Sequence, residues 1–137
     1  MRLALFMTLA AVAALLFGLA FLLVPASLLS LYGITLDPSA QWVARYLGSA
    51  FLGIAALTWL GRAATSGPGL RAILVGGFVV SITGLVVAIF DRLYGSGNML
   101  VWSTVVIYLL LSLGFGYFVF LKPPPKYVPP EERRTPL

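Results

Sequence analysis

The chain has 137 residues, of which 61% are hydrophobic and only 9% are charged. An ordinary soluble domain carries about 25% charged residues, so a compact soluble fold could not cover this surface with polar groups. Nine basic and four acidic residues give a net charge of +5, with no cluster that would suit nucleic acid. Neither Cys nor His is present, which excludes disulfides and removes the commonest metal ligand and general base. We expect an all-α integral membrane protein in contact with membrane lipids, without a cofactor or a metal.

Four apolar stretches follow one another, each close to the length of about 20 residues that spans a ~30 Å hydrocarbon core. In lipid the backbone must satisfy its own hydrogen bonds, so each stretch is predicted to be a helix. The sequence therefore predicts a four-helix bundle in up-down order over residues 1–121, followed by a Pro-rich cytoplasmic tail over residues 122–137. The predicted helices cover about residues 3–24, 40–60, 70–90 and 99–121.

Breaker residues fall between these stretches. Pro25 closes the first helix, and Asp37-Pro38 opens the second, because Asp suits the N-cap and Pro the first helical position. The segment between them, residues 26–34, is too apolar for a fully solvated linker. It is either a short helix lying in the membrane interface or a continuation of the first helix kinked at Pro25.

The distribution of basic residues predicts the orientation. With four helices both termini lie on one side, and that side would hold seven of the nine basic residues, whereas the opposite loops hold only Arg92. We therefore expect both termini to be cytoplasmic and the protein to be a multi-pass protein of a cell membrane. The seven residues are Arg2, Arg62, Arg71, Lys122, Lys126, Arg133 and Arg134.

Apart from Arg71 at the very start of the third predicted span, Arg45 is the one charged residue within a predicted span. A charge at the centre of a membrane helix costs about 2.5–3.5 kcal/mol on insertion scales, and less near an end. Its guanidinium either extends to the headgroups, or forms an ion pair with Asp91 or Asp37 on the same predicted side, or binds the polar head of a ligand. We treat Arg45, Asp91 and Asp37 as the candidate polar site.

Small residues recur at a spacing of four along the predicted helices, which lets helix backbones approach closely in lipid. They serve either packing within the bundle or contact with a second copy or another membrane subunit. The candidate packing and partner-contact residues are Gly48, Ser49, Gly53, Gly77, Ser81, Gly84, Ser112 and Gly116.

Several local motifs resemble those of short bacterial four-helix membrane proteins of uncharacterised function, which are loosely grouped with DoxX-like proteins. The motifs lie at residues 21–25 (FLLVP), 31–33 (LYG), 37–38 (DP) and 44–50 (ARYLGSA). The resemblance covers the four predicted helices and implies a four-helix bundle in a bacterial inner membrane. By resemblance, Arg45 and Gly48 match the Arg-x-x-Gly feature of the group. Some DoxX-like proteins are linked to thiol or quinone redox processes, and this chain lacks the Cys that thiol chemistry needs.

No Ser is placed beside a His or Lys that could activate it as a nucleophile, so we do not expect an enzyme. The sequence favours a non-catalytic accessory or structural subunit of a larger membrane complex, respiratory or photosynthetic. The alternative is a small binder or carrier of a lipid, a quinone or another apolar ligand, with Arg45 in contact with its polar head.

Overall fold

A computed structural model of the protein describes residues 2–94, 98–125 and 128. These residues form helices and connecting turns without a strand, so the predicted all-α class is confirmed. The element η1 is a short π-helix that continues α5. The elements are α1 (Leu3–Leu23), α2 (Pro25–Leu31), α3 (Pro38–Gly61), α4 (Pro68–Tyr94), α5 (Val101–Gly116) and η1 (Tyr117–Leu121).

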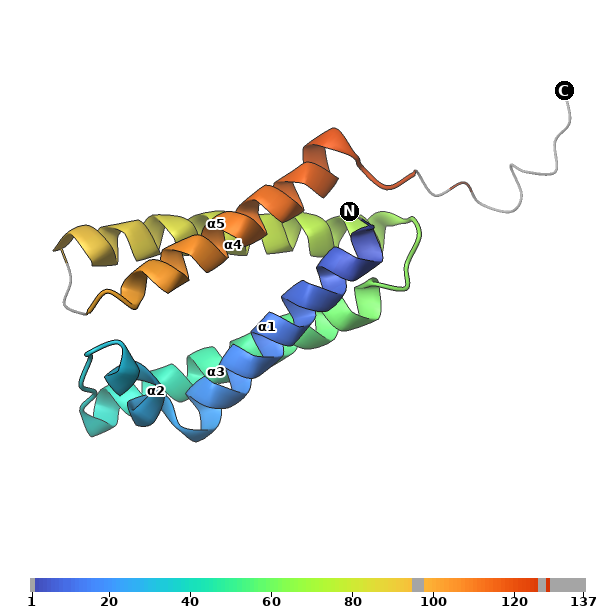
Figure 1. Cartoon of the computed structure of the whole chain (residues 1–137). Helices are drawn as coiled ribbons and strands as arrows, with labels where there is room; N and C mark the ends of the chain where they lie inside the picture. Colours follow the sequence, from blue (N-terminus) through green and yellow to red (C-terminus); the bar gives the residue numbers. More distant parts are fainter. Residues whose placement is uncertain (1, 95–97, 126–127, 129–137) are drawn as a thin grey trace, which may run out of the picture.

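The long helices form two antiparallel hairpins, α1 with α3 and α4 with α5 (Figure 1). The start of α1, the turn between α3 and α4, and the end of η1 lie at one end of the molecule, which we call the terminal end (Figure 1). The short α2 and the start of α5 lie at the opposite end, which we call the α2 end. The up-down order is as predicted, and the cytoplasmic placement of the termini stays a prediction.

Within the described residues, four helical segments are long and apolar enough to cross a membrane: α1, α3, α4, and α5 together with η1. Large apolar side chains point outward along them, for example Leu16 (63% exposed), Leu60 (74%) and Leu110 (62%). The contacts between helices are instead rich in Ala, Gly and Ser. This distribution suits lipid as the surrounding solvent, because lipid chains are as apolar as Leu. The chain has the architecture of a small multi-pass integral membrane protein.

The predicted capping of α3 is confirmed. Pro38 occupies the first helical position, and the Asp37 carboxylate accepts a hydrogen bond of 2.8 Å from the Ala40 N–H. Helix α4 continues to Tyr94, four residues beyond the predicted end, because no Gly or Pro interrupts it before Gly95. Helix α5 begins at Val101, since the preceding residues form a turn in which the Val101 N–H donates to the Asn98 carbonyl.

The apolar segment after α1 forms a separate short helix, α2, which is the first of the two alternatives. Val24 leaves helical geometry (φ −135°, ψ 52°), and Pro25 then starts the new helix. Proline suits this first position because it has no N–H to leave unsatisfied there. Leu28 and Leu29 are half-buried, and Leu31 is 63% exposed. Whether α2 lies in a membrane interface stays a prediction.

The largest apolar core lies toward the terminal end and joins the two hairpins. Phe6 of α1 packs edge-on against Phe115 of α5, with ring centroids 4.8 Å apart. Met7 and Leu74 are fully enclosed in the same cluster. Phe118 of η1 completes it, because the π-helical turn places this ring inward while Phe120 remains 69% exposed.

Candidate functional site

The end of α2 is closed by a Schellman motif. Gly33 adopts a positive φ of 75°, which a residue without a Cβ tolerates. Its N–H donates to the Ser30 carbonyl, and the Ile34 N–H donates to the Leu29 carbonyl, each at 3.0 Å. These two bonds satisfy two of the last carbonyls of the helix. The carbonyls of Leu31 and Tyr32 are left for another donor.

Asn98, from the segment before α5, supplies that donor. Its backbone N–H donates to the Tyr32 carbonyl at 2.9 Å, and its side-chain Nδ2 donates to the Leu31 carbonyl at 2.8 Å. Its Oδ1 accepts from the Leu100 N–H at 2.9 Å. One side chain therefore organises the start of α5 and joins it to α2, across 67 residues of sequence.

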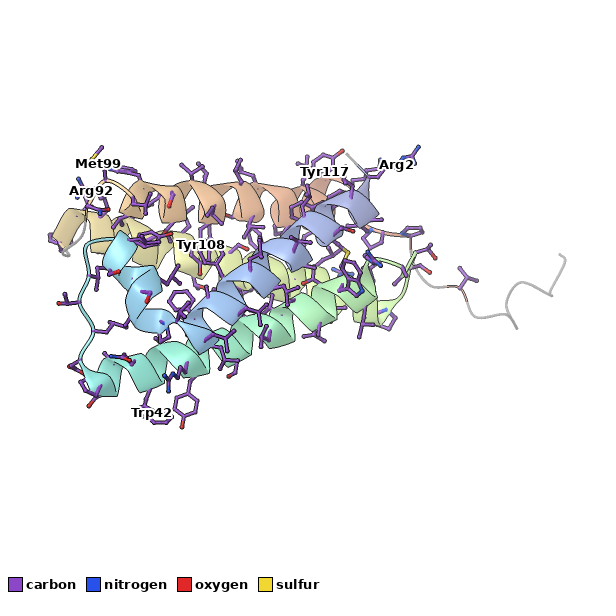
Figure 2. The ribbon with its side chains drawn as sticks, turned by 60° about the horizontal axis from the view of Figure 1, so that its bottom comes forward. Arg2, Trp42, Arg92, Met99, Tyr108 and Tyr117 are labelled. Carbon is purple, nitrogen blue, oxygen red and sulfur yellow. The ribbon has the colours of Figure 1, made fainter. Side chains whose placement is uncertain are left out.

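Each of the three tryptophans lies under an arginine near a helix end. The guanidinium carbon of Arg62 is 3.3 Å from the ring centroid of Trp59 at the terminal end. The two other pairs belong to the α2 end and lie on different sides of the molecule, as the labels of Trp42 and Arg92 in Figure 2 show. There Arg45 lies 5.2 Å from Trp42, and Arg92 lies 5.7 Å from Trp102. Such distances are within the range of cation–π attraction.

Arg45 is half-buried on α3, and its Nε is enclosed without a hydrogen-bond partner. The carboxylate of Asp37 caps α3, and no ion pair joins it to Arg45. The side chain of Asp91, the other predicted partner, lies outside the described residues. The structure thus gives Arg45 one aromatic neighbour, Trp42, and its role as a ligand site stays a prediction.

Four of the predicted packing glycines lie at close contacts between helices. A Cβ on Gly48 would lie 2.7 Å from the Leu22 nitrogen, so α1 and α3 touch through their backbones. Rings of the paired helix cover the glycines of the other hairpin: Phe115 covers Gly77, Tyr108 covers Gly84, and Phe78 covers Gly116.

Four of the predicted packing residues remain, three serines and one glycine, and they form a buried pair and an outward pair. Ser81 and Ser112 are buried, and each donates to a carbonyl of the preceding turn, that of Gly77 or Tyr108 respectively. Ser49 and Gly53 face outward on α3. Ser49 donates to the Tyr46 carbonyl at 2.7 Å, and a Cβ on Gly53 would meet nothing within 4 Å. The sequence pattern named all these residues, but it did not separate the enclosed ones from the outward pair.

Sequence reasoning missed Asn98 and the arginine–tryptophan pairs. The spacing of three residues from Trp42 to Arg45 and from Trp59 to Arg62 is a usable signal, because such residues share a helix face. Arg92 and Trp102 come from different helices and give no such signal. Across the described residues no three His, Cys, Asp or Glu side chains gather where they could hold a metal.

Comparison of this chain with protein families, with curated proteins and with solved structures found no match. The resemblance to short bacterial four-helix membrane proteins therefore rests on the sequence motifs given above. Fold and site together define a small multi-pass membrane protein.

Proposed function

We propose that the protein is a non-catalytic accessory subunit of a larger membrane complex, respiratory or photosynthetic, in a bacterial inner membrane. The observation that carries the proposal is the outward notch at Ser49 and Gly53 on α3. Helices in lipid associate where small residues let backbones approach. The protein already uses this device internally, where Gly48 of α3 meets α1.

The notch is framed by large side chains at both ends. Trp42 (60% exposed) and Tyr46 (73%) precede it, and Leu57 (58%) follows it on the same face. The Ser49 hydroxyl donates within its own helix, so the notch presents little unsatisfied polarity to a partner. A transmembrane helix of another subunit is the occupant that such a shape accommodates.

The test is co-purification from the native membrane in mild detergent, with and without crosslinking. Gly53→Leu fills the notch and should shift the protein from a large assembly to its free size. Gly76→Leu is the matched control, because Gly76 on α4 is equally open and outward, and it should leave the assembly intact. The proposal fails if the wild-type protein migrates alone, or if both variants behave alike.

A second candidate function is the binding of an anionic lipid or another apolar molecule with a polar head. The observation that favours it is the Arg45 guanidinium, which is half-buried within a membrane-spanning helix and has an enclosed Nε without a partner. A phosphate oxygen would satisfy such a group by a charge-assisted hydrogen bond. The Trp42 ring beside it suits the level of the headgroups.

Native mass spectrometry of the detergent-solubilised protein tests this second candidate. The wild type should retain anionic lipid, Arg45→Gln should lose it, and Arg45→Lys should retain part of it. Arg2→Gln removes an exposed arginine elsewhere and serves as the control. Equal retention by Arg45→Gln and the wild type, or none by the wild type, would exclude Arg45 as the lipid contact.

A further inference from the structure

The two hairpins are joined differently at the two ends of the molecule. Toward the terminal end the junction is apolar and buried: Phe6 of α1, Leu74 of α4 and Phe115 of α5 share one cluster. At the α2 end the junction that the structure describes is polar, and it is made by Asn98 with the carbonyls of Leu31 and Tyr32. The first junction is shielded from water, whereas the second is exposed.

Asn98 supplies two hydrogen-bond donors, and the end of α2 offers two carbonyls that need a donor. The Schellman motif consumes the carbonyls of Leu29 and Ser30, and the next two carbonyls receive the two donors of Asn98. An exposed hydrogen bond competes with water, so its net contribution is small. Regions held by few buried apolar contacts and exposed hydrogen bonds open before a buried core does.

We propose that Asn98 is a latch and that the apolar core toward the terminal end is the hinge of an opening motion between the two hairpins. When the Asn98 bonds to Leu31 and Tyr32 break, the α2 end of the α1–α3 hairpin separates from that of the α4–α5 hairpin. The opening faces the bilayer, because both hairpins present apolar side chains outward.

Spin labels on two pairs of sites measure the motion. The chain contains no Cys, so the two cysteines introduced in each variant are its only labelling sites. Ser27→Cys with Tyr94→Cys spans the hairpins at the α2 end, and Leu60→Cys with Leu121→Cys spans them at the terminal end. All four side chains are exposed, so the labels displace no core contact. Double electron–electron resonance in lipid nanodiscs gives the two distance distributions.

Two variants at position 98 separate the bond to α2 from the bond within the turn before α5. Asn98→Ala removes both the donor to the Leu31 carbonyl and the acceptor for the Leu100 N–H. Asn98→Asp keeps an acceptor for Leu100, but its carboxylate cannot donate to Leu31. Ser103→Ala is the control, because its hydroxyl bonds only to the nearby Leu100 carbonyl.

We expect both Asn98 variants to add a longer distance between the labels at positions 27 and 94, while the pair at positions 60 and 121 keeps the wild-type distance. Ser103→Ala should match the wild type at both pairs. The latch is refuted if Asn98→Asp leaves the distance between positions 27 and 94 unchanged, because loss of the turn bond to the Leu100 N–H alone would then explain any effect of Asn98→Ala. The hinge is refuted if the distance between positions 60 and 121 lengthens as well.

Discussion

The two hairpins use glycine in opposite ways. In the α1–α3 hairpin, glycines bring backbone against backbone: a Cβ on Gly48 would lie 2.8 Å from the Gly18 carbonyl oxygen. In the α4–α5 hairpin, glycines form seats for aromatic rings, and a Cβ on Gly77 would lie 2.5 Å from the Phe115 ring. Both arrangements replace a hydrophobic driving force that lipid does not provide.

The difference determines how each hairpin can respond to added volume. A ring can turn or shift when the seat beneath it is filled, provided that its surroundings leave room. Two backbones in contact have no rotamer to change, so the helices themselves must separate. The same Gly→Ala substitution should therefore destabilise the protein more in the α1–α3 hairpin than in the α4–α5 hairpin.

The largest expected loss of stability is at Phe115, whose ring covers Gly77 and also belongs to the apolar core that joins the hairpins. Phe115 is 4% exposed, and Phe115→Ala should lower the free energy of unfolding by about 3–5 kcal/mol, because the vacated space cannot fully collapse. Denaturation in mixed detergent micelles measures it. Phe90→Ala, at a ring that is 58% exposed, should cost within about 1 kcal/mol. Similar losses for the two variants would show that the buried Phe115 ring contributes no more to stability than an exposed ring does.

Gly48→Ala tests the backbone contact between α1 and α3. The added methyl group would meet the Leu22 nitrogen and the Gly18 carbonyl oxygen, so we expect a loss of about 1–3 kcal/mol in the same unfolding measurement. Gly53→Ala lies on the same helix with open space around it, and it should be neutral or slightly stabilising. If the two variants unfold alike, the helices do not meet at Gly48.

The polar residues before α3 and α5 also differ, since Asp37 bonds within its own helix whereas Asn98 shapes the turn before α5 and bonds to the end of α2. Asp37→Ala should lower the free energy of unfolding by about 1 kcal/mol through loss of the bond to the Ala40 N–H. Asp37→Asn keeps an acceptor and should restore most of that stability. Both variants should leave the distance between labels at positions 27 and 94 as in the wild type. A change in that distance would place Asp37 in the junction of the hairpins.

The smallest effect is expected at Gly116. A Cβ there would lie 3.1 Å from the Phe78 ring, which is only half-buried and can move by a few tenths of an ångström. Gly116→Ala should therefore change the free energy of unfolding by less than about 1 kcal/mol. A loss as large as that of Gly48→Ala would remove the distinction between ring seats and backbone contacts.

Local signals in the sequence were sufficient for the class and for most boundaries. Asp37 and Pro38 specify the start of α3 because capping depends on neighbouring residues alone. The segment after Pro25 left two alternatives, since a short apolar stretch suits either a new helix or a kinked one. The π-helix after Gly116 was not predicted: its hydrogen bonds span five residues where those of an α-helix span four, and the phenylalanines there suit both.

The candidate site was less predictable because its contacts are long-range. A glycine such as Gly33 is typical of a helix end, but nothing near it indicated that Asn98 would donate to the Leu31 and Tyr32 carbonyls. Asp37 was a predicted partner of Arg45 because it lies two helical turns earlier on the same predicted side, but its carboxylate accepts from the Ala40 N–H instead. Small residues were recognised by their spacing, whereas their partners depend on how the helices are arranged.

The stacking of every tryptophan beneath an arginine has a practical consequence for spectroscopy. Trp42 and Trp102 belong to one end of the molecule and Trp59 to the other, so intrinsic fluorescence samples both faces of a bilayer at shallow depth. Lipids brominated near the glycerol should quench this emission more than lipids brominated at the chain terminus. Quenching of the intrinsic tryptophan fluorescence in vesicles would thus report the depth of the helix ends in the bilayer without an added dye.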